Sequence, residues 1–160
     1  MRDPRDVAVS LAHHTGMAID RTIAFMADPT AALGRAGNRQ MRQFMSTWSF
    51  HVESWLSDGP ELLLLRYEDM LADPDAALGR VAWHLGLDAA PENLRQAVEA
   101  TRFDKLREAE ERDGFRERSP SSARFFRQGV AGGWRDTLTM AQAEQIAADH
   151  GLVMARLGYG

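Results

Sequence analysis

The residues best suited to binding an anion lie near the end of the sequence. Residues 125–135 include two phenylalanines, two arginines and three glycines. Glycines let backbone N–H groups approach an anion, and an arginine offers a forked donor to a phosphate. Residues 112–135 contain six arginines but only two acidic residues, Asp113 and Glu117. This pattern fits either an anion-binding loop or a solvated loop between helices, and composition leaves both open.

The single lysine of the sequence, Lys105, also bears on phosphate chemistry. The other 18 of the 19 basic residues are arginines. A phosphate loop of the P-loop type needs a glycine-rich turn that carries a lysine. No glycine lies within residues 101–107, which surround Lys105. We therefore expect no complete phosphate loop in this sequence.

Other kinds of reactive site find little support. The absence of cysteine excludes thiolate chemistry and thiolate metal ligands. His13 and His14 are adjacent, so on a helix they point about 100° apart and do not chelate together. His51, His84 and His150 lack ligand spacing, and no nucleophile motif of the Gly-x-Ser-x-Gly type occurs. We expect no metal site.

The composition places the protein in a broad class. Its 160 residues, 44% hydrophobic and with four tryptophans, suit one folded domain with a core. A net charge of −4 argues against general nucleic-acid binding. No apolar run approaches the roughly 18 residues that span a bilayer, and residues 1–6 lack the apolar part of a signal peptide. A soluble, cytoplasmic protein without membrane contact is the expectation.

Helical signals dominate the elements that must position these residues. Asp-Pro pairs at residues 3–4, 28–29 and 73–74 each predict a capping aspartate before the first helical residue. Apolar spacing predicts a helix over residues 38–56, and Thr139 with Gln142 forms a capping-box pattern. The predicted helices cover residues 4–16, 19–27, 38–56, 74–86, 91–101, 103–112 and 139–157.

One segment has the pattern of a buried strand. Residues 61–67 contain a continuous run of four leucines after a turn signal, as in strands of a parallel sheet. One strand cannot form a sheet, so its partners must come from elsewhere. Residues 113–138 are expected to be irregular.

Four segments, taken in order, resemble those of the PAPS-dependent sulfotransferases of bacterial type. They are Arg2-Asp3-Pro4-Arg5-Asp6-Val7-Ala8-Val9-Ser10, Arg66-Tyr67-Glu68-Asp69-Met70, Thr101-Arg102-Phe103 and residues 126–134, followed by Leu157-Gly158-Tyr159. That family transfers a sulfuryl group from 3′-phosphoadenosine 5′-phosphosulfate (PAPS) to a hydroxyl or amine. The resemblance implies an enzyme acting on a small-molecule acceptor.

The resemblance also implies a fold and a cofactor site. The fold would be α/β, the P-loop-NTPase-like sulfotransferase fold, of which residues 1–160 form the C-terminal part as a single partial domain. It would be predominantly helical, with one buried parallel strand near residues 62–66. The residues carried over for binding PAPS or adenosine 3′,5′-bisphosphate are Arg2, Ser10, Tyr67, Thr101, Phe103, Phe126, Arg127 and Gly129.

Departures from the family pattern affect the expected activity. In the family, the segment that residues 126–134 resemble closes on the 3′-phosphate, and we call it the closing loop. Gln128 replaces a lysine of that loop, and Gly133 replaces an aspartate before Trp134. The family's lysine-bearing phosphate loop and its histidine base have no counterpart in this sequence, so no catalytic residue is assigned. We expect little or no activity from this chain alone. The alternative is a non-catalytic remnant that binds nucleotide or docks on a partner.

Two further patterns leave their alternatives open. Arg135, Thr139 and Glu144 resemble a short dimer motif of the family, but Thr139 also fits a simple helix cap. The aromatic residues of the helix with Trp48 and Trp55 fit either a core face or a wall beside the acceptor.

Overall fold

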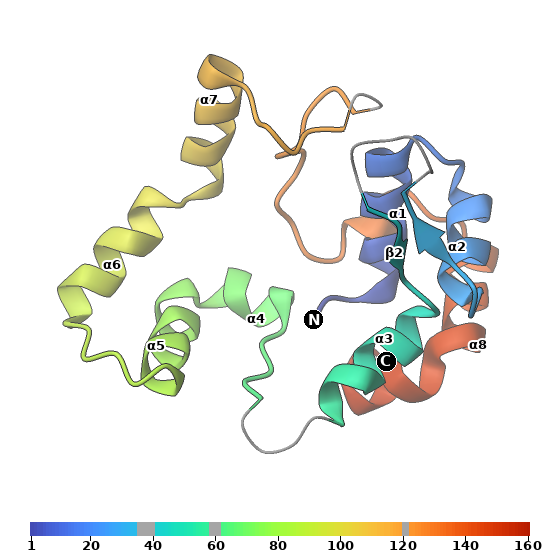
Figure 1. Ribbon diagram of the computed structural model, residues 1–160, viewed down its shortest axis with the longest axis horizontal. Helices are drawn as coiled ribbons and strands as arrows, with labels where there is room; N and C mark the ends of the chain where they lie inside the picture. The colour runs from blue at the N-terminus through green and yellow to red at the C-terminus, as the bar shows by residue number, and fades with distance from the viewer. Residues whose placement is uncertain (35–40, 58–61, 120–121) are drawn as a thin grey trace. The chain divides into compact units, whose positions relative to one another are not determined.

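The computed structural model describes residues 1–34, 41–57, 62–119 and 122–160 (Figure 1). The chain divides into two compact units. Unit 1 comprises residues 1–2 and 63–131, and unit 2 comprises residues 3–62 and 132–160. The described part is predominantly helical, as predicted. Its one small sheet, of two antiparallel strands, was not predicted.

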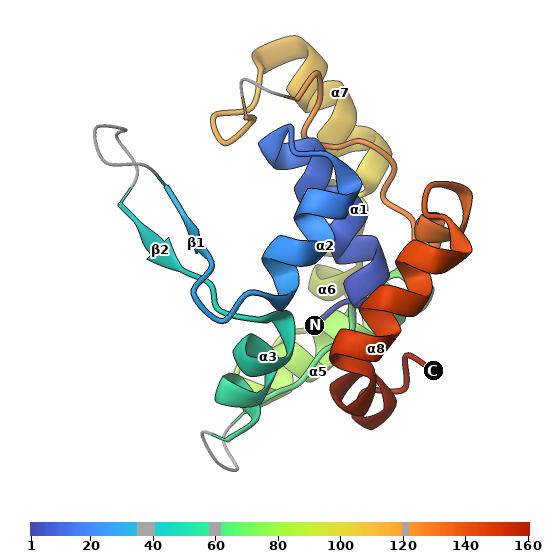
Figure 2. The ribbon, with the colours of Figure 1, turned by 90° about the vertical axis from the view of Figure 1, so that its right-hand side faces the viewer.

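Unit 2 is built around helix α8 (Met140–Arg156). Helices α1 (Pro4–Thr15), α2 (Ile19–Ala27) and α3 (Trp48–Leu56) all pack against α8, as Figure 2 shows. The short 3-10 helix η1 (Gly133–Asp136) packs against α1. The interior is apolar because each helix turns its hydrophobic side inward. Its buried residues include Ala8, Val9, Ile23, Met26, Val52, Ile146, Val153 and Met154.

The predicted helix ends of unit 2 are mostly confirmed. The Asp3 carboxylate accepts from the Arg5 N–H (2.9 Å) at the start of α1, and Gly16 ends that helix with a φ of 72°. Both capping-box hydrogen bonds form between Thr139 and Gln142. Asp28 is an exception, because its carboxylate accepts from the Thr30 N–H (2.7 Å) in a turn and starts no helix.

The prediction of one helix over residues 38–56 is wrong in its first part. Residues 38–40 lie outside the described residues. Strand β2 (Gln43–Phe44) pairs antiparallel with β1 (Ala32–Leu33), and α3 begins only at Trp48. Ser46 has a left-handed φ of 55°, and the Thr47 hydroxyl accepts from the Phe50 N–H (3.0 Å) as the true helix cap. A left-handed residue before a cap interrupts a helix whatever its apolar spacing.

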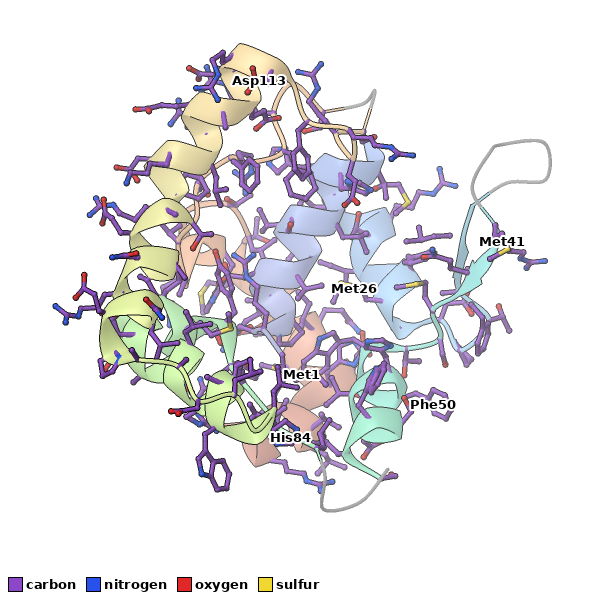
Figure 3. All side chains as sticks on the ribbon, turned by 60° about the vertical axis from the view of Figure 1, so that its left-hand side comes forward. Met1, Met26, Met41, Phe50, His84 and Asp113 are labelled. Atoms are coloured by element: carbon purple, nitrogen blue, oxygen red, sulfur yellow. The ribbon has the colours of Figure 1, made fainter. Side chains whose placement is uncertain are left out.

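The hairpin and α3 present large apolar side chains to solvent. Met41 of the hairpin is 85% exposed and Phe50 of α3 is 57% exposed; both project outward in Figure 3. Val52 is fully buried, whereas Trp55 on the same helix is 50% exposed. The aromatic residues of α3 therefore do not all belong to the core.

Among its described residues, unit 1 contains four helices, followed by an irregular loop. They are α4 (Tyr67–Ala72), α5 (Pro74–His84), α6 (Pro91–Ala100) and α7 (Phe103–Asp113). The last three match the predicted helices to within two residues, whereas α4 was not predicted. Asp73 caps α5 as expected, accepting from the Ala76 N–H (2.9 Å). Helix α5 packs against both α4 and α6.

The buried parallel strand predicted near residues 62–66 does not form. These residues have no strand assignment, and Leu62 is 37% exposed while residues 63–66 are half-buried. The Tyr67 N–H donates to the Met1 carbonyl (2.7 Å), and the Met1 amine donates to the Leu65 carbonyl. These two bonds do not make a sheet, because a ladder needs a neighbouring strand along its length. Within the described residues, no such neighbour is present.

Helix length and hydropathy bear on membrane insertion. Among the helices that the structure describes, none combines the length and the apolar character needed to cross a bilayer.

Candidate functional site

Arg2 and Tyr67 meet at the start of helix α4. The Arg2 guanidinium carbon lies 4.3 Å from the centre of the Tyr67 ring, a cation–π geometry. Arg2 also donates through Nη2 to the Val130 carbonyl (3.0 Å), 128 residues away in sequence. The predicted phosphate-binding arginine and the predicted closing loop therefore lie side by side in unit 1.

Phe103 and Gly129 form the second contact of the predicted set. Phe103 begins α7, and Gly129 has a φ of 64°. A Cβ atom on Gly129 would lie 2.4 Å from Cδ2 of Phe103, which is far inside van der Waals contact. Only glycine permits both this conformation and this approach. The turn at Gly129 is thus shaped to fit against the Phe103 ring.

Phe126 belongs to a cluster of aromatic rings. Its ring centre is 6.2 Å from that of Phe103 and 5.1 Å from those of Phe115 and Phe125, all in edge-to-face geometry. Phe115 and Phe125 lie 4.5 Å apart. Such pairs add roughly 0.5–1.5 kcal/mol beyond burial. The cluster links α7 to the loop that carries Arg127.

Arg127 and Thr101 both belong to unit 1. Arg127 is half-buried and follows Phe126 directly. Thr101 ends α6, where its exposed hydroxyl donates to the carbonyls of Ala97 (2.8 Å) and Val98 (3.3 Å). Thr101 precedes Phe103 by two residues, and the hydrogen bonds of its hydroxyl go to its own helix.

Ser10 is the one predicted cofactor residue outside unit 1. It is exposed on α1 in unit 2. The other seven all belong to unit 1, where Arg2, Val130, Gly129, Phe103 and Phe126 are joined by the contacts above.

Glu110 is a site residue that the sequence reasoning missed. It lies seven residues after Phe103 on α7 and is only 6% exposed. Its two carboxylate oxygens accept from the backbone N–H groups of Phe125 (2.7 Å) and Phe126 (2.9 Å). The signal was present, because an acid at i and i+7 spacing from Phe103 falls on the inward side of the helix.

The electrostatic surroundings of Glu110 keep it charged. Burial alone would raise its pKa, but the Phe125 and Phe126 N–H groups and the charges of Arg118 and Arg124 together outweigh burial. The pKa of Glu110 is therefore held below its ordinary value. This buried carboxylate accepts from two backbone N–H groups and so holds the loop in position at Phe125 and Phe126.

Asp6 plays a similar part for the end of the loop that belongs to unit 2. It is 3% exposed, and its carboxylate accepts from the N–H groups of Gly132 (2.7 Å) and Trp134 (2.9 Å). Two guanidinium groups lie over the Trp134 ring, that of Arg5 at 4.3 Å and that of Arg135 at 4.5 Å from the ring centre. The sequence reasoning also missed Asp6, although it named the segment that contains it.

Two of the three residues of the predicted dimer motif have partners within unit 2. Arg135 lies over Trp134, the Thr139 hydroxyl accepts from the Gln142 N–H (3.2 Å), and Glu144 is exposed on α8. Dimer formation stays a prediction.

Two further cations of unit 1 form ion pairs. Lys105 pairs with Glu99 (2.8 Å), so the single lysine serves a surface ion pair. Arg124 pairs with Glu111 (3.1 Å). Among the described residues, no group of three or more His, Asp or Glu side chains could hold a metal ion.

Known proteins resemble this chain along almost its whole length. The model of the sulfotransferase domain matches residues 1–158. Dog (Canis lupus familiaris) sulfotransferase 1A1 is 28% identical over 170 residues, covering 98% of this chain and 54% of the relative. Human (Homo sapiens) sulfotransferase 2B1 is 27% identical over 156 residues, covering 89% of this chain and 40% of the relative.

Solved structures show the same fold. Mouse sulfotransferase SULT7A1, complexed with PAP, aligns with a TM-score of 0.73 at 19% identity, over 96% of this chain and 57% of its own. Retinol dehydratase, in complex with androsterone and the inactive cofactor PAP, aligns with a TM-score of 0.72 at 24% identity. The alignment covers 96% of this chain and 46% of the retinol dehydratase chain. The chain spans about half the length of the relatives it matches. It belongs to the sulfotransferase domain family.

Proposed function

We propose that this chain is the cofactor-binding part of a PAPS-dependent sulfotransferase. The observation that carries the proposal is the hydrogen bond from Arg2 to the Val130 carbonyl, which joins two segments of the family pattern within unit 1. Related structures contain PAP, and the family match favours a sulfotransferase over a remnant that only binds or docks.

The residues present fit the chemistry of a phosphorylated adenosine. Arg2 and Arg127 supply guanidinium groups for phosphate. The left-handed turn at Gly129 packs against the Phe103 ring and follows Arg127 by two residues. Tyr67, Phe103 and Phe126 supply rings suited to a base. When bound, PAPS would supply the sulfuryl group, and these residues would hold its adenosine 3′-phosphate end.

The acceptor and the assembly are further parts of the proposal. A hydroxyl or amine of a small molecule would receive the sulfuryl group. A homodimer through Arg135, Thr139 and Glu144 remains a prediction that light scattering on the purified chain checks. The single partial domain, the bacterial type and the cytoplasmic location also remain predictions.

A titration with adenosine 3′,5′-bisphosphate tests the proposed site. We expect the purified chain to bind this nucleotide, and Arg127→Ala and Arg2→Ala to weaken binding at least about tenfold, since a hydrogen bond to a charged group contributes about 1.5–3 kcal/mol. Arg95→Ala is the matched control, because Arg95 is exposed on α6 and forms an ion pair with the exposed Glu92 (2.9 Å). A folded wild-type chain that binds no nucleotide would refute the proposal.

Turnover provides a separate test. We expect little or no PAPS-dependent sulfuryl transfer from the 160-residue chain, because its one lysine is paired with Glu99 and no residue in it matches the family's base. Measurable turnover by the purified chain would contradict this part while leaving the nucleotide site intact.

A further inference from the structure

Arg127, the central phosphate residue of the proposed site, lies between two anchors in unit 1. On one side, Phe125 and Phe126 donate their backbone N–H groups to Glu110. On the other side, the Val130 carbonyl accepts from Arg2. The backbone position of Arg127 therefore depends on two contacts made by residues far from it in sequence.

The anchor at Glu110 is a buried carboxylate whose two oxygens both accept hydrogen bonds. The side chain is 6% exposed, and each of its two oxygens has its own backbone donor at 2.7–2.9 Å. The two cations that act on it, Arg118 and Arg124, favour its ionised form. A neutral amide of the same shape would present an NH₂ group to one of the two backbone donors, and this mismatch would release part of the loop.

We propose that Glu110 is a positioning residue for the nucleotide site. By fixing the N–H groups of Phe125 and Phe126, it sets where Arg127 and the Gly129 turn present their donors to a 3′-phosphate. The inference rests on the proposed function, because it assigns Glu110 to the same site. Glu110 acts through the loop and has no direct contact with the nucleotide in this proposal.

Two nucleotides distinguish positioning from general stability. Adenosine 3′,5′-bisphosphate carries the 3′-phosphate that the loop would grip, and adenosine 5′-monophosphate lacks it. In Glu110→Gln we expect the dissociation constant for the bisphosphate to rise about tenfold, and that for the monophosphate to change by less than about twofold. Isothermal titration of both ligands gives the two values.

Glu108→Gln is the matched control. Glu108 lies on the same helix two residues earlier, is exposed, and undergoes the same change of charge and shape. We expect its affinity for both nucleotides to equal that of the wild type. A long-range effect of lost negative charge would act in both variants, whereas loss of the backbone contacts occurs only in Glu110→Gln.

The possible outcomes separate this inference from the proposed function. A wild-type chain that binds neither nucleotide refutes the proposed site, and the positioning role falls with it. Wild-type binding of the bisphosphate with unchanged affinity in Glu110→Gln refutes the positioning role alone, as does an equal loss for both nucleotides. If Glu110→Gln does not fold, Glu110→Asp takes its place, since it keeps the charge but shortens the reach. A loss confined to the bisphosphate then supports the role, and no such loss refutes it.

Discussion

The two units of this chain differ in their buried apolar residues and in their share of the predicted cofactor residues. Among the described residues, buried apolar side chains belong almost entirely to unit 2, and unit 1 contributes only Ala77 and Ala82. Unit 1 instead carries seven of the eight residues predicted to bind the cofactor. Apolar burial is the main favourable term in folding, so unit 2 is expected to be the more stable part.

The same contrast appears in two buried carboxylates. Asp6 holds the backbone of Gly132 and Trp134 within unit 2, beside fully buried core residues of α1. Glu110 holds Phe125 and Phe126 within unit 1, where Phe125 is 42% exposed. Similar hydrogen bonds thus support a packed interior in one unit and the loop of the proposed nucleotide site in the other. Sites that change on binding come from less stable regions.

The largest expected effect tests the core of unit 2. Ile146→Ala on α8 removes a side chain that is 1% exposed, and we expect the free energy of unfolding to fall by about 2–5 kcal/mol through lost burial and a cavity. Denaturant unfolding followed by circular dichroism measures it. Leu152→Ala on the same helix is the control, because Leu152 is 92% exposed, and its effect should stay within about 0.5 kcal/mol. Equal losses of unfolding free energy in both variants would show that the buried core of unit 2 is not the source of its stability.

Asp6→Asn tests the polar anchor of the same unit. The amide places an NH₂ group where a carboxylate oxygen accepts from a backbone N–H, and we expect a loss of about 1.5–3 kcal/mol in unfolding free energy. Asp20→Asn is the matched control, since Asp20 is exposed on α2 and keeps an oxygen that can accept from Gln142. An unchanged denaturation midpoint in Asp6→Asn would show that the anchor contributes no stability.

Hydrogen exchange compares the two units directly. Helix α6 of unit 1 has no buried residue, whereas α8 buries five, so we expect α6 amides to exchange at least about tenfold faster. Adenosine 3′,5′-bisphosphate should slow exchange in unit 1 if it binds there. Equal protection of α6 and α8 in the free chain would contradict the division of stability.

The smallest effect is a pH dependence centred on His150 of unit 2. Burial lowers its pKa, opposed in part by Asp149. The unfolded chain therefore binds a proton more readily than the folded one. Stability is complete above the ordinary histidine pKa of 6.5 and is lost as the pH falls below it towards the folded value.

We expect the denaturation midpoint of the wild type to drop more between pH 7.5 and pH 5.5 than that of His150→Gln. The variant lacks the titrating group but can still reach the Ser49 hydroxyl, which lies 2.9 Å from Nδ1 of His150 in the wild type. Identical pH dependence in the two proteins would assign the titration to other groups.

Some of the fold and the site could be predicted because the signals are local. Asp3 and Pro4 start α1, Gly16 ends it, and Thr139 with Gln142 starts α8, since each uses hydrogen bonds within a few residues. The helix predicted over residues 38–56 failed for the opposite reason. Apolar spacing continued through Phe44, while pairing with Ala32 placed that residue in a hairpin.

By itself, the sequence determined the order of the family segments, the single lysine at residue 105, and the caps that start α1 and α8. Only the tertiary structure decided that Arg2 contacts Val130, that residues 62–66 form no strand, and that Glu110 and Asp6 are buried anchors. These features depend on contacts between residues up to 128 positions apart, and their free energy arises from burial and partners that local spacing does not specify.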